Sequence, residues 1–143
     1  MPYDISQMAM EDYDQVVEFW RDQEGLGLNE SDSRENIARY LERNPGMSFV
    51  ARDEGQVVGA VLCGHEGRRG YMHHLAVAPS HRNRGLGRVL VDRCMDQLRA
   101  AGISRCNIFL FADNHDAKRF WRAVGFVERR DLTLLQRVID GRC

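Results

Sequence analysis

The sequence predicts an α+β fold, in which a central, mostly antiparallel twisted sheet contains one parallel strand pair and is flanked by about four helices. Two mainly apolar segments, residues 48–52 and 56–63, flank the turn Asp53-Glu54-Gly55 and predict a hairpin. Beyond Pro79 the spacing of apolar residues changes from two to about 3.6, the change expected from strand to helix. The strand–helix–strand order of residues 71–111 needs a crossover, and a crossover joins parallel strands.

The first third of the chain is expected to form one short strand, residues 3–6, and two helices. The first helix is predicted by apolar residues that recur on one helix face, namely Tyr13, Val16, Val17 and Trp20. The second is expected to begin near Asp32, where Asp32 and Glu35 form a pair like a capping box, and to end at Asn44-Pro45-Gly46. Ile37, Tyr40 and Leu41 are expected to be its buried side chains.

After the hairpin, a strand over residues 71–77 is expected to lead into a helix over residues 86–99. An apolar strand is predicted over residues 103–111. A fourth helix then begins at Asp113 or Asn114 and ends at Gly125. Residues 126–130 and 133–137 are expected to form a closing hairpin.

Composition limits the classes of protein to consider. A chain of 143 residues with 43% apolar residues suits one globular domain, residues 1–143. The net charge of -1 gives no general attraction to nucleic acid, so none is expected as a partner. The apolar runs are too short to cross a bilayer, and residues 1–4 carry no signal pattern, so a cytoplasmic protein without a membrane partner is expected.

The cysteines form no pair at metal-ligand spacing. Cys63, Cys94 and Cys106 are interpreted as small buried residues, and Cys143 as a tail residue. No metal is expected.

The turn between the strand at 71–77 and the next helix has the features of an anion site. A helix start exposes unpaired N–H groups with partial positive charge, and Gly85 and Gly87 remove side chains that would obstruct a phosphate. Three arginines add local positive charge: Arg82, Arg84 and Arg88. The alternative is that the glycines only permit a tight turn and the arginines are solvated.

This turn resembles the cofactor motif of the GCN5-related N-acetyltransferase (GNAT) family, Arg/Gln-x-x-Gly-x-Gly/Ala between the fourth strand and the third helix. Here it is Arg82-Asn83-Arg84-Gly85-Leu86-Gly87. The preceding Leu75-Ala76-Val77-Ala78-Pro79 and the later Asn114-x-x-Ala117-x-x-Phe120-Trp121-x-x-x-Gly125-Phe126 resemble the family too. The order of elements agrees over nearly the whole chain, so the two motifs together are specific although each alone is weak.

The resemblance implies an N-acetyltransferase that moves an acetyl group from acetyl-CoA to a primary amine by direct attack in a ternary complex. It implies that the parallel strand pair is splayed to admit the pantetheine arm, and that a backbone donor at Leu75 stabilises the oxyanion. For Asn114 a helix N-cap is an equally good interpretation. The residues implied in acetyl-CoA binding are Leu75, Ala76, Val77, Arg82, Asn83, Arg84, Gly85, Leu86, Gly87, Arg88, Asn114 and Trp121.

Two catalytic positions depart from the family pattern. Tyr71 stands where relatives often carry a glutamate, so His73, on the same face of a regular strand, becomes the candidate base and Glu66 the runner-up. The same alternation places His74 on the opposite face, which argues against a metal shared by the two histidines. Trp121 stands where many relatives carry a tyrosine acid, and indole cannot deliver that proton.

The acceptor stays open among a small metabolite, a polyamine-like antibiotic and a peptide amine. Because the usual acid and base positions are substituted, a non-catalytic acyl-CoA sensor or scaffold is the alternative function. The closing hairpin, with Leu132, Leu134 and Leu135, either supplies the edge of a homodimer or completes the core.

Overall fold

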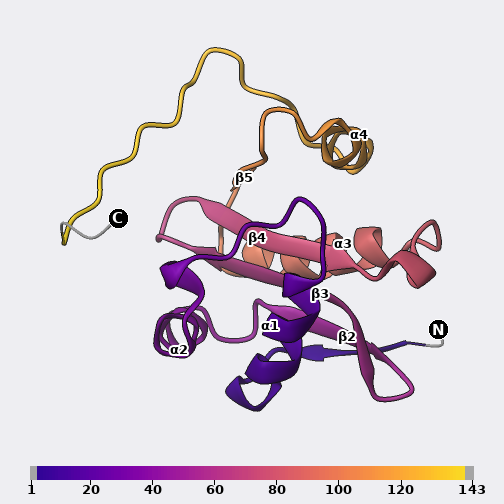
Figure 1. The fold of residues 1–143 in the computed structure, drawn as a ribbon. Helices are drawn as coiled ribbons and strands as arrows, with labels where there is room; N and C mark the ends of the chain where they lie inside the picture. Colours follow the sequence, from indigo (N-terminus) through magenta and orange to yellow (C-terminus); the bar gives the residue numbers. More distant parts are fainter. Residues whose placement is uncertain (1–2, 141–143) are drawn as a thin grey trace. The chain divides into compact units, whose positions relative to one another are not determined.

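The structure is a computed structural model that describes residues 3–140 (Figure 1). Residues up to Phe111 form one compact unit and residues from Ala112 onward form a second. The organisation of residues 1–143 as a single domain stays a prediction. The elements in chain order are β1 (Asp4–Gln7), η1 (Met10–Asp12), α1 (Tyr13–Arg21), η2 (Glu30–Asp32), α2 (Arg34–Arg43), β2 (Phe49–Asp53), β3 (Gln56–His65), β4 (Gly70–Val77), η3 (Pro79–His81), α3 (Leu86–Ala100), β5 (Cys106–Ile108) and α4 (His115–Ala123).

The predicted fold class is confirmed by the sheet of the first unit. Its strands lie in the order β1-β2-β3-β4-β5, with antiparallel pairing from β1 to β4 and parallel pairing between β4 and β5. The β2–β3 hairpin closes through Glu54 and Gly55, whose φ angles are 50° and 82°. Two consecutive positive φ values fit the two-residue turn that matches the twist of paired strands.

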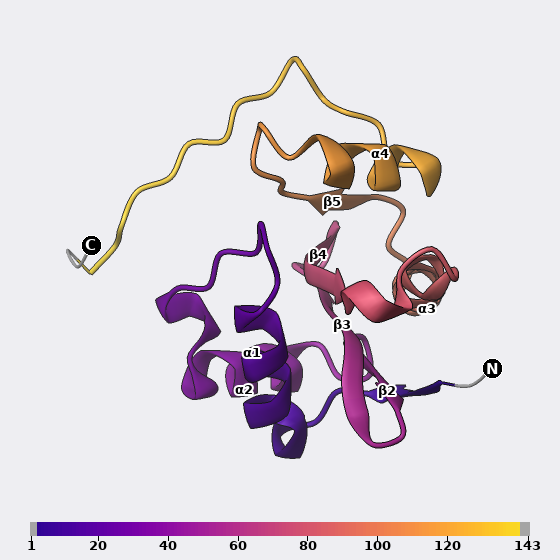
Figure 2. The same cartoon turned by 45° about the vertical axis from the view of Figure 1, so that its right-hand side comes forward.

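The core has one layer on each face of the sheet. Helices α1 and α2 cover one face, and α3 covers the other (Figure 2). The first layer is an apolar cluster that joins both helices to β2 and β3; its buried members are Met8, Val16, Val17, Trp20, Ile37, Val50, Ala60 and Leu62. Ala76 of β4 packs against this cluster. The expected face of α1 is buried at Val16, Val17 and Trp20, whereas the expected face of α2 is buried at Ile37 and only partly buried at Tyr40 and Leu41.

Helix α3 packs closely against the strands because glycines face it. A Cβ placed on Gly59 would lie 3.1 Å from Leu90 Cδ1, and one placed on Gly70 would lie 2.7 Å from Leu98 Cδ1. The N-terminal part of α3 therefore lies over Gly59, and its C-terminal part lies over Gly70. The apolar stripe of α3 is buried at Leu86, Leu90, Val91, Cys94 and Leu98.

Three elements differ from the sequence prediction. Ser33, not Asp32, caps α2, since the Asn36 N–H donates to Ser33 Oγ at 3.2 Å, while Asp32 ends the separate turn η2. The strand expected over residues 103–111 is reduced to the three residues of β5. The prediction of a closing hairpin is wrong, because residues 126–140 contain no strand.

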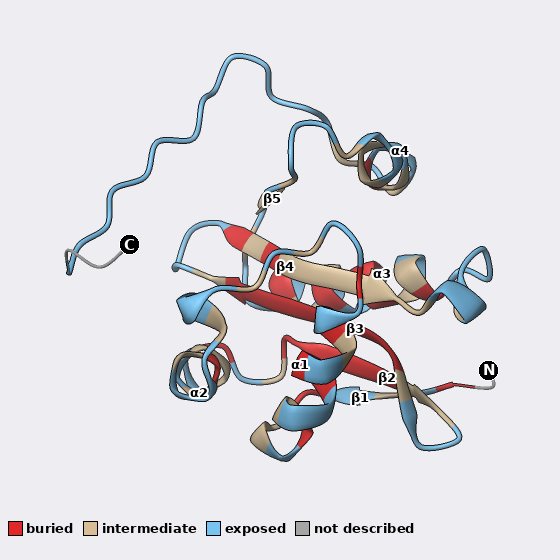
Figure 3. Cartoon of the chain, in the orientation of Figure 1, coloured by how far each residue is buried: buried red, intermediate tan, exposed pale blue. Residues whose placement is uncertain are grey.

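Residues 127–140 are exposed along their whole length (Figure 3). Arg129 pairs with Asp131 and Arg130 with Glu128, each two residues away, and Glu128 also pairs with Lys118 and Arg122 of α4. A strand ladder is stabilised mainly by the face that it buries, and this segment buries none. Of the helices within residues 3–140, none has the length and apolar character that a membrane crossing requires.

Candidate active site

A β-bulge interrupts the pairing of β3 with β4. Ala60 pairs with Ala76, but Leu62 pairs with His73, so β4 contains one residue more than β3 between these two pairs. His74 lies in the extra segment with φ +56°, a left-handed conformation that is uncommon for a residue with a Cβ. A bulge leaves residues unpaired and redirects the side chains around it.

The bulge places both adjacent histidines on the face covered by α1 and α2. The ring centroid of His73 lies 6.3 Å from that of Tyr40 in α2, and that of His74 lies 5.1 Å from that of Trp20 in α1. The expectation that His73 and His74 point to opposite faces is wrong, since the extra residue shifts the alternation. Within residues 3–140, no group of three or more His, Cys, Asp or Glu side chains is arranged to hold a metal ion.

His73 lies half-buried among aromatic rings. Its imidazole stacks with Tyr71 and Phe109, at centroid distances of 6.4 and 6.3 Å, and has no hydrogen-bond partner in the described part of the chain. Burial lowers the pKa of His73, the neighbouring His74 lowers it further, and Asp32 acts in the opposite direction. The imidazole is therefore neutral at pH 7 and can accept a proton.

Glu66, by contrast, is an exposed carboxylate that its own turn already binds. Its Oε1 accepts from the Arg68 N–H at 2.7 Å and the Arg69 N–H at 3.2 Å, and its Oε2 lies 2.8 Å from Arg68 Nη2. These bonds from Arg68 hold the pKa of Glu66 below its usual value. A carboxylate stabilised in this way is a weak base.

The second half of β4 is paired on one side only. β5 pairs with β4 only from Gly70 to Met72, so in the described chain the edge of residues 73–77 that faces away from β3 has no neighbouring strand. Leu75 also lacks a register partner in β3, because it lies in the bulge. This edge of β4 is therefore open to an extended ligand, as β-strand addition requires.

The glycine-bearing turn after β4 ends in an open helix N-terminus. Gly85 is the N-cap of α3 with φ +82°, no side chain caps the helix, and a Cβ on Gly85 would meet nothing within 4 Å. In the described part of the chain, the N–H groups of Gly85, Leu86 and Gly87 donate to no acceptor. Such unpaired amides at a helix start, with the helix dipole behind them, form a site for an anion.

The arginines of this turn do not share one role. Arg82 is exposed, and its Nε donates to the Val77 carbonyl at 3.0 Å while Nη2 lies 3.4 Å from Gln23 Oε1. It therefore ties the turn to the end of β4 and to the C-terminal end of α1. Arg84 and Arg88 are exposed and carry their charges close to the start of α3.

Two expected cofactor residues, Asn114 and Trp121, belong to the second unit. Asn114 is the N-cap of α4, where its Oδ1 accepts from the Ala117 N–H at 3.1 Å. Trp121 is buried, and its ring packs edge-on against Phe120 and Phe126 at centroid distances of 5.3 and 4.9 Å. The N-cap interpretation of Asn114 is confirmed, and a contact of either residue with acetyl-CoA stays a prediction.

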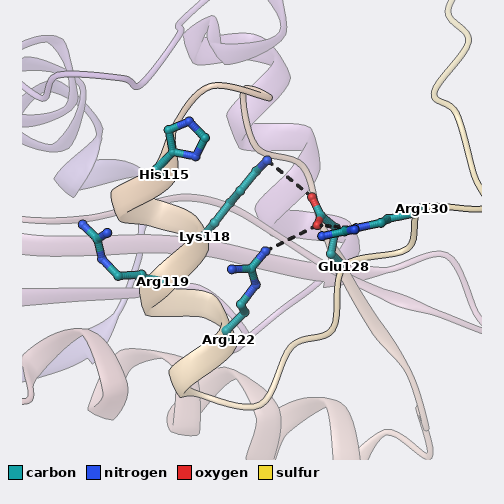
Figure 4. Close-up of a pocket in the computed structure, with 6 residues that line it drawn as sticks. All are labelled: His115, Lys118, Arg119, Arg122, Glu128 and Arg130. Atoms are coloured by element: carbon teal, nitrogen blue, oxygen red, sulfur yellow. Dashed lines mark hydrogen bonds and ion pairs between the residues drawn. The ribbon is translucent and has the colours of Figure 1, made fainter.

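A hollow of about 730 Å³ also lies in the second unit (Figure 4). Its lining comprises His115, Lys118, Arg119, Arg122, Glu128 and Arg130. The Glu128 carboxylate lies 3.4, 3.4 and 3.1 Å from nitrogens of Lys118, Arg122 and Arg130, so it neutralises part of this positive charge. None of the candidate site residues lines this hollow, and we assign it no catalytic role.

Sequence reasoning missed the pair formed by Asp32 and His74. Nε2 of His74 lies 2.9 Å from Oδ1 of Asp32, and both side chains are largely buried. Two adjacent histidines in a predicted strand give no sign of a bulge. The sequence signal for Asp32 is its spacing from Asn29, because Asn29 caps η2 and its own N–H donates to Asp32 Oδ2.

The cysteines are free and need no special role. Cys63 and Cys94 are buried, and Cys106 is partly buried. Burial and then Cys63 raise the pKa of Cys106 to about 12, so its thiol stays neutral at pH 7. Cys143 lies outside the described residues.

Comparison with known proteins agrees with this geometry. An acetyltransferase of Sodalis glossinidius is 30% identical over 134 residues, which cover 92% of this chain and 93% of that protein. The fold is similar to the PaiA N-acetyltransferase of Thermoplasma acidophilum in complex with coenzyme A, with a TM-score of 0.77, 17% identity and coverage of 89% of this chain and 91% of the other. It is also similar to AAC(6')-Iy in complex with the bisubstrate analogue CoA-S-monomethyl-acetylneamine, with a TM-score of 0.74, 18% identity and coverage of 96% and 99%.

The sequence model of the acetyltransferase (GNAT) family matches residues 13–126, a span that includes α1, the bulged strand β4, the open start of α3 and α4. With that match over most of its length, the chain belongs to the GNAT family of acetyltransferases.

Proposed function

We propose that this protein transfers the acetyl group of acetyl-CoA to a primary amine by direct attack in a ternary complex. The observation that carries the proposal is the open N-terminus of α3. Its first amides are unpaired, and Gly85 has no side chain that would obstruct a ligand there. A pyrophosphate supplies the acceptors that these amides lack, and its charge is stabilised by the helix dipole. The solved structures of PaiA with coenzyme A and of AAC(6')-Iy with its CoA-containing analogue support this choice of ligand.

The pantetheine arm is assigned to the unpaired edge of β4. Leu75, in the bulge, offers backbone groups there, Ala76 and Val77 continue the same edge, and the chain continues directly into the phosphate turn. Arg82, which bonds to the Val77 carbonyl, keeps strand and turn in register. Asn83, Arg84, Leu86, Gly87 and Arg88 complete the turn. For Asn114 and Trp121, only the family motif supports a contact with acetyl-CoA.

The reaction requires a neutral amine, because a protonated nitrogen has no lone pair with which to attack. We assign His73 as the group that takes the amine proton, since its lowered pKa keeps it neutral and its nitrogens are unpartnered. The amine nitrogen forms a bond to the thioester carbon, the Leu75 N–H stabilises the oxyanion, and the C–S bond then breaks. Trp121 cannot donate a proton, so the leaving thiolate takes one from water.

An amine-panel assay tests the proposal against the sensor alternative. Purified protein with acetyl-CoA is mixed in turn with an aminoglycoside, a polyamine, an amino sugar phosphate and a peptide with a free amino terminus, and release of free thiol is followed. We expect amine-dependent release with at least one class and a product whose mass is larger by one acetyl group. Tight binding of acetyl-CoA without release for any class would favour the sensor.

A further inference from the structure

The backbone of His74 has a conformation that is uncommon for a residue with a side chain. Its φ of +56° lies in the left-handed region, which few residues other than glycine adopt, although histidine, like asparagine and aspartate, does so more often than most. Such a conformation persists only where the surroundings stabilise it, and it is found most often at functional sites. The contacts of the His74 ring are therefore the place to look for what stabilises the bulge of β4.

Those contacts come from two elements that precede the sheet. From η2, Asp32 Oδ1 lies 2.9 Å from His74 Nε2, with side-chain exposures of 11% for Asp32 and 20% for His74. From α1, the edge of the Trp20 ring lies against the imidazole at a centroid distance of 5.1 Å. On β4 itself, His73 is the neighbouring titratable group. Asp32 is the charged group that acts on His74 directly.

Asp32 is itself fixed by its own turn. Its Oδ2 accepts from the Asn29 N–H at 3.1 Å, and its carbonyl accepts from the Tyr13 hydroxyl at 2.6 Å. It also lines a hollow of about 220 Å³, together with Tyr13, Val17, Arg21, Leu28, Asn29 and Ser33. One carboxylate thus joins the α1–α2 connection, with its hollow, to the bulge in β4.

We propose that the Asp32–His74 pair positions the bulge, so that the α1–α2 connection fixes where the Leu75 N–H points. In this assignment, which rests on the proposed function, Asp32 and His74 are positioning residues and Leu75 supplies the group that contacts the reacting carbonyl. The pair determines the turnover rate more than acetyl-CoA affinity, because the phosphate turn is separate from it.

The chain contains a matched control, the ion pair of Asp12 and Arg52. Its nitrogen–oxygen distance is 2.8 Å, and its side-chain exposures, 12% and 21%, nearly equal those of Asp32 and His74. It joins η1 to β2, outside β4 and the phosphate turn. Asp12→Asn therefore removes a similarly buried charge without touching the bulge.

The first experiment compares Asp32→Asn with Asp12→Asn in the full chain, using acetyl-CoA and the most active amine of the panel. We expect Asp32→Asn to lower kcat about tenfold to hundredfold, the scale of a small misplacement of a reacting group, and to leave KM for acetyl-CoA within about twofold. Asp12→Asn should lower Tm to a similar extent and keep kcat within about twofold. If the two variants lose the same amount of Tm and also the same amount of kcat, the proposal is overturned.

The second experiment uses side chains that differ in their tolerance of the left-handed conformation. Asparagine adopts positive φ and keeps an amide that can donate towards Asp32, whereas alanine does neither. His74→Asn should therefore recover most of the kcat that His74→Ala loses. Equal kcat in the two variants would count against a positioning role.

Hydrogen exchange separates this inference from the proposed function, since it needs no acceptor. In Asp32→Asn the amides of residues 73–77 should exchange faster than in the wild type, whereas in Asp12→Asn they should not. Unchanged exchange in Asp32→Asn sinks the pairing proposal even if the wild type is an active enzyme. If exchange is faster in Asp32→Asn but the wild type is inactive, the positioning of the bulge is supported and only the proposed acetyl transfer is rejected.

Discussion

Strand β4 and helix α3 pack side by side, and the two ends of this pair have similar backbone geometry. They differ in which partners the backbone N–H and C=O groups have. We call residues 70–72 and 98–103 the closed end, and residues 73–87 the open end. A glycine with φ +82° stands at each end of α3, Gly85 at its start and Gly102 just after it, and neither has an atom near its missing side chain. The conformation of these glycines is therefore not what distinguishes a binding site.

The difference lies in the hydrogen bonds. At the closed end the N–H groups of Ala101, Gly102 and Ile103 donate to carbonyls of the last turn of α3, and β4 is paired with both β3 and β5. At the open end the first amides of α3 have no acceptor in the described chain, and β4 is paired on one side only. Polar backbone groups that a fold leaves unsatisfied are expected to have a partner from outside.

Removing the proposed base from the open end should have the largest effect. His73→Gln cannot accept a proton at neutral pH, so we expect kcat to fall about a hundredfold or more. Because burial lowers the pKa of His73, the wild-type rate should fall only as pH drops through a value below the usual one of a histidine, and this acid limb should be absent in His73→Gln. Steady-state kinetics between pH 5 and pH 8, on the order of the range in which histidine titrates, measures both effects.

The runner-up base provides the contrast. Glu66→Gln should keep both kcat and the acid limb, because the bonds from Arg68 already hold the pKa of this carboxylate low. If the acid limb disappears in Glu66→Gln and persists in His73→Gln, the two assignments must be exchanged.

The open end of α3 can be tested against its closed end with two equivalent substitutions. Gly85→Asp and Gly102→Asp introduce the same side chain at the same φ of +82°, in open space, so both create similar backbone strain. Only Gly85→Asp brings a negative charge to the proposed pyrophosphate site, and we expect it to weaken acetyl-CoA binding about tenfold or more. Calorimetry should show an unchanged affinity in Gly102→Asp; an equal loss in both variants would mean that strain, not the anion site, explains the result.

Most of the fold could be predicted from the sequence because local patterns determine it. The Asp53-Glu54-Gly55 turn, the apolar face that includes Trp20 and the stripe on α3 each use residues close in the chain. The closing hairpin failed for the opposite reason. Residues 126–130 and 133–137 were predicted as strands, but a strand also needs a neighbour that buries one face, and local sequence does not specify one.

The site was predictable where it depends on a turn and unpredictable where it depends on register. The open start of α3 followed from Gly85 at a strand-to-helix junction. The faces of His73 and His74 did not follow, because a single extra residue reverses the alternation, and nothing in the residue types of 73–76 marks it. Asp32 meets His74 across 42 positions of sequence, a contact that only the assembled sheet creates.

The smallest functional effect is expected from crowding the closed end. Gly70 has no positive φ, so alanine fits its backbone, but the new Cβ would lie 2.7 Å from Cδ1 of the buried Leu98. Overpacking of this kind costs about 1–3 kcal/mol, so Gly70→Ala should lower Tm by several degrees, whereas acetyl-CoA affinity should stay within about twofold. Combining it with Leu98→Val makes room for the methyl group, so the double variant should lose less stability than the sum of the two single ones. Additive losses in that cycle would show that the contact between Gly70 and Leu98 does not limit the packing, and a loss of affinity in Gly70→Ala would show that the two ends of β4 are not independent.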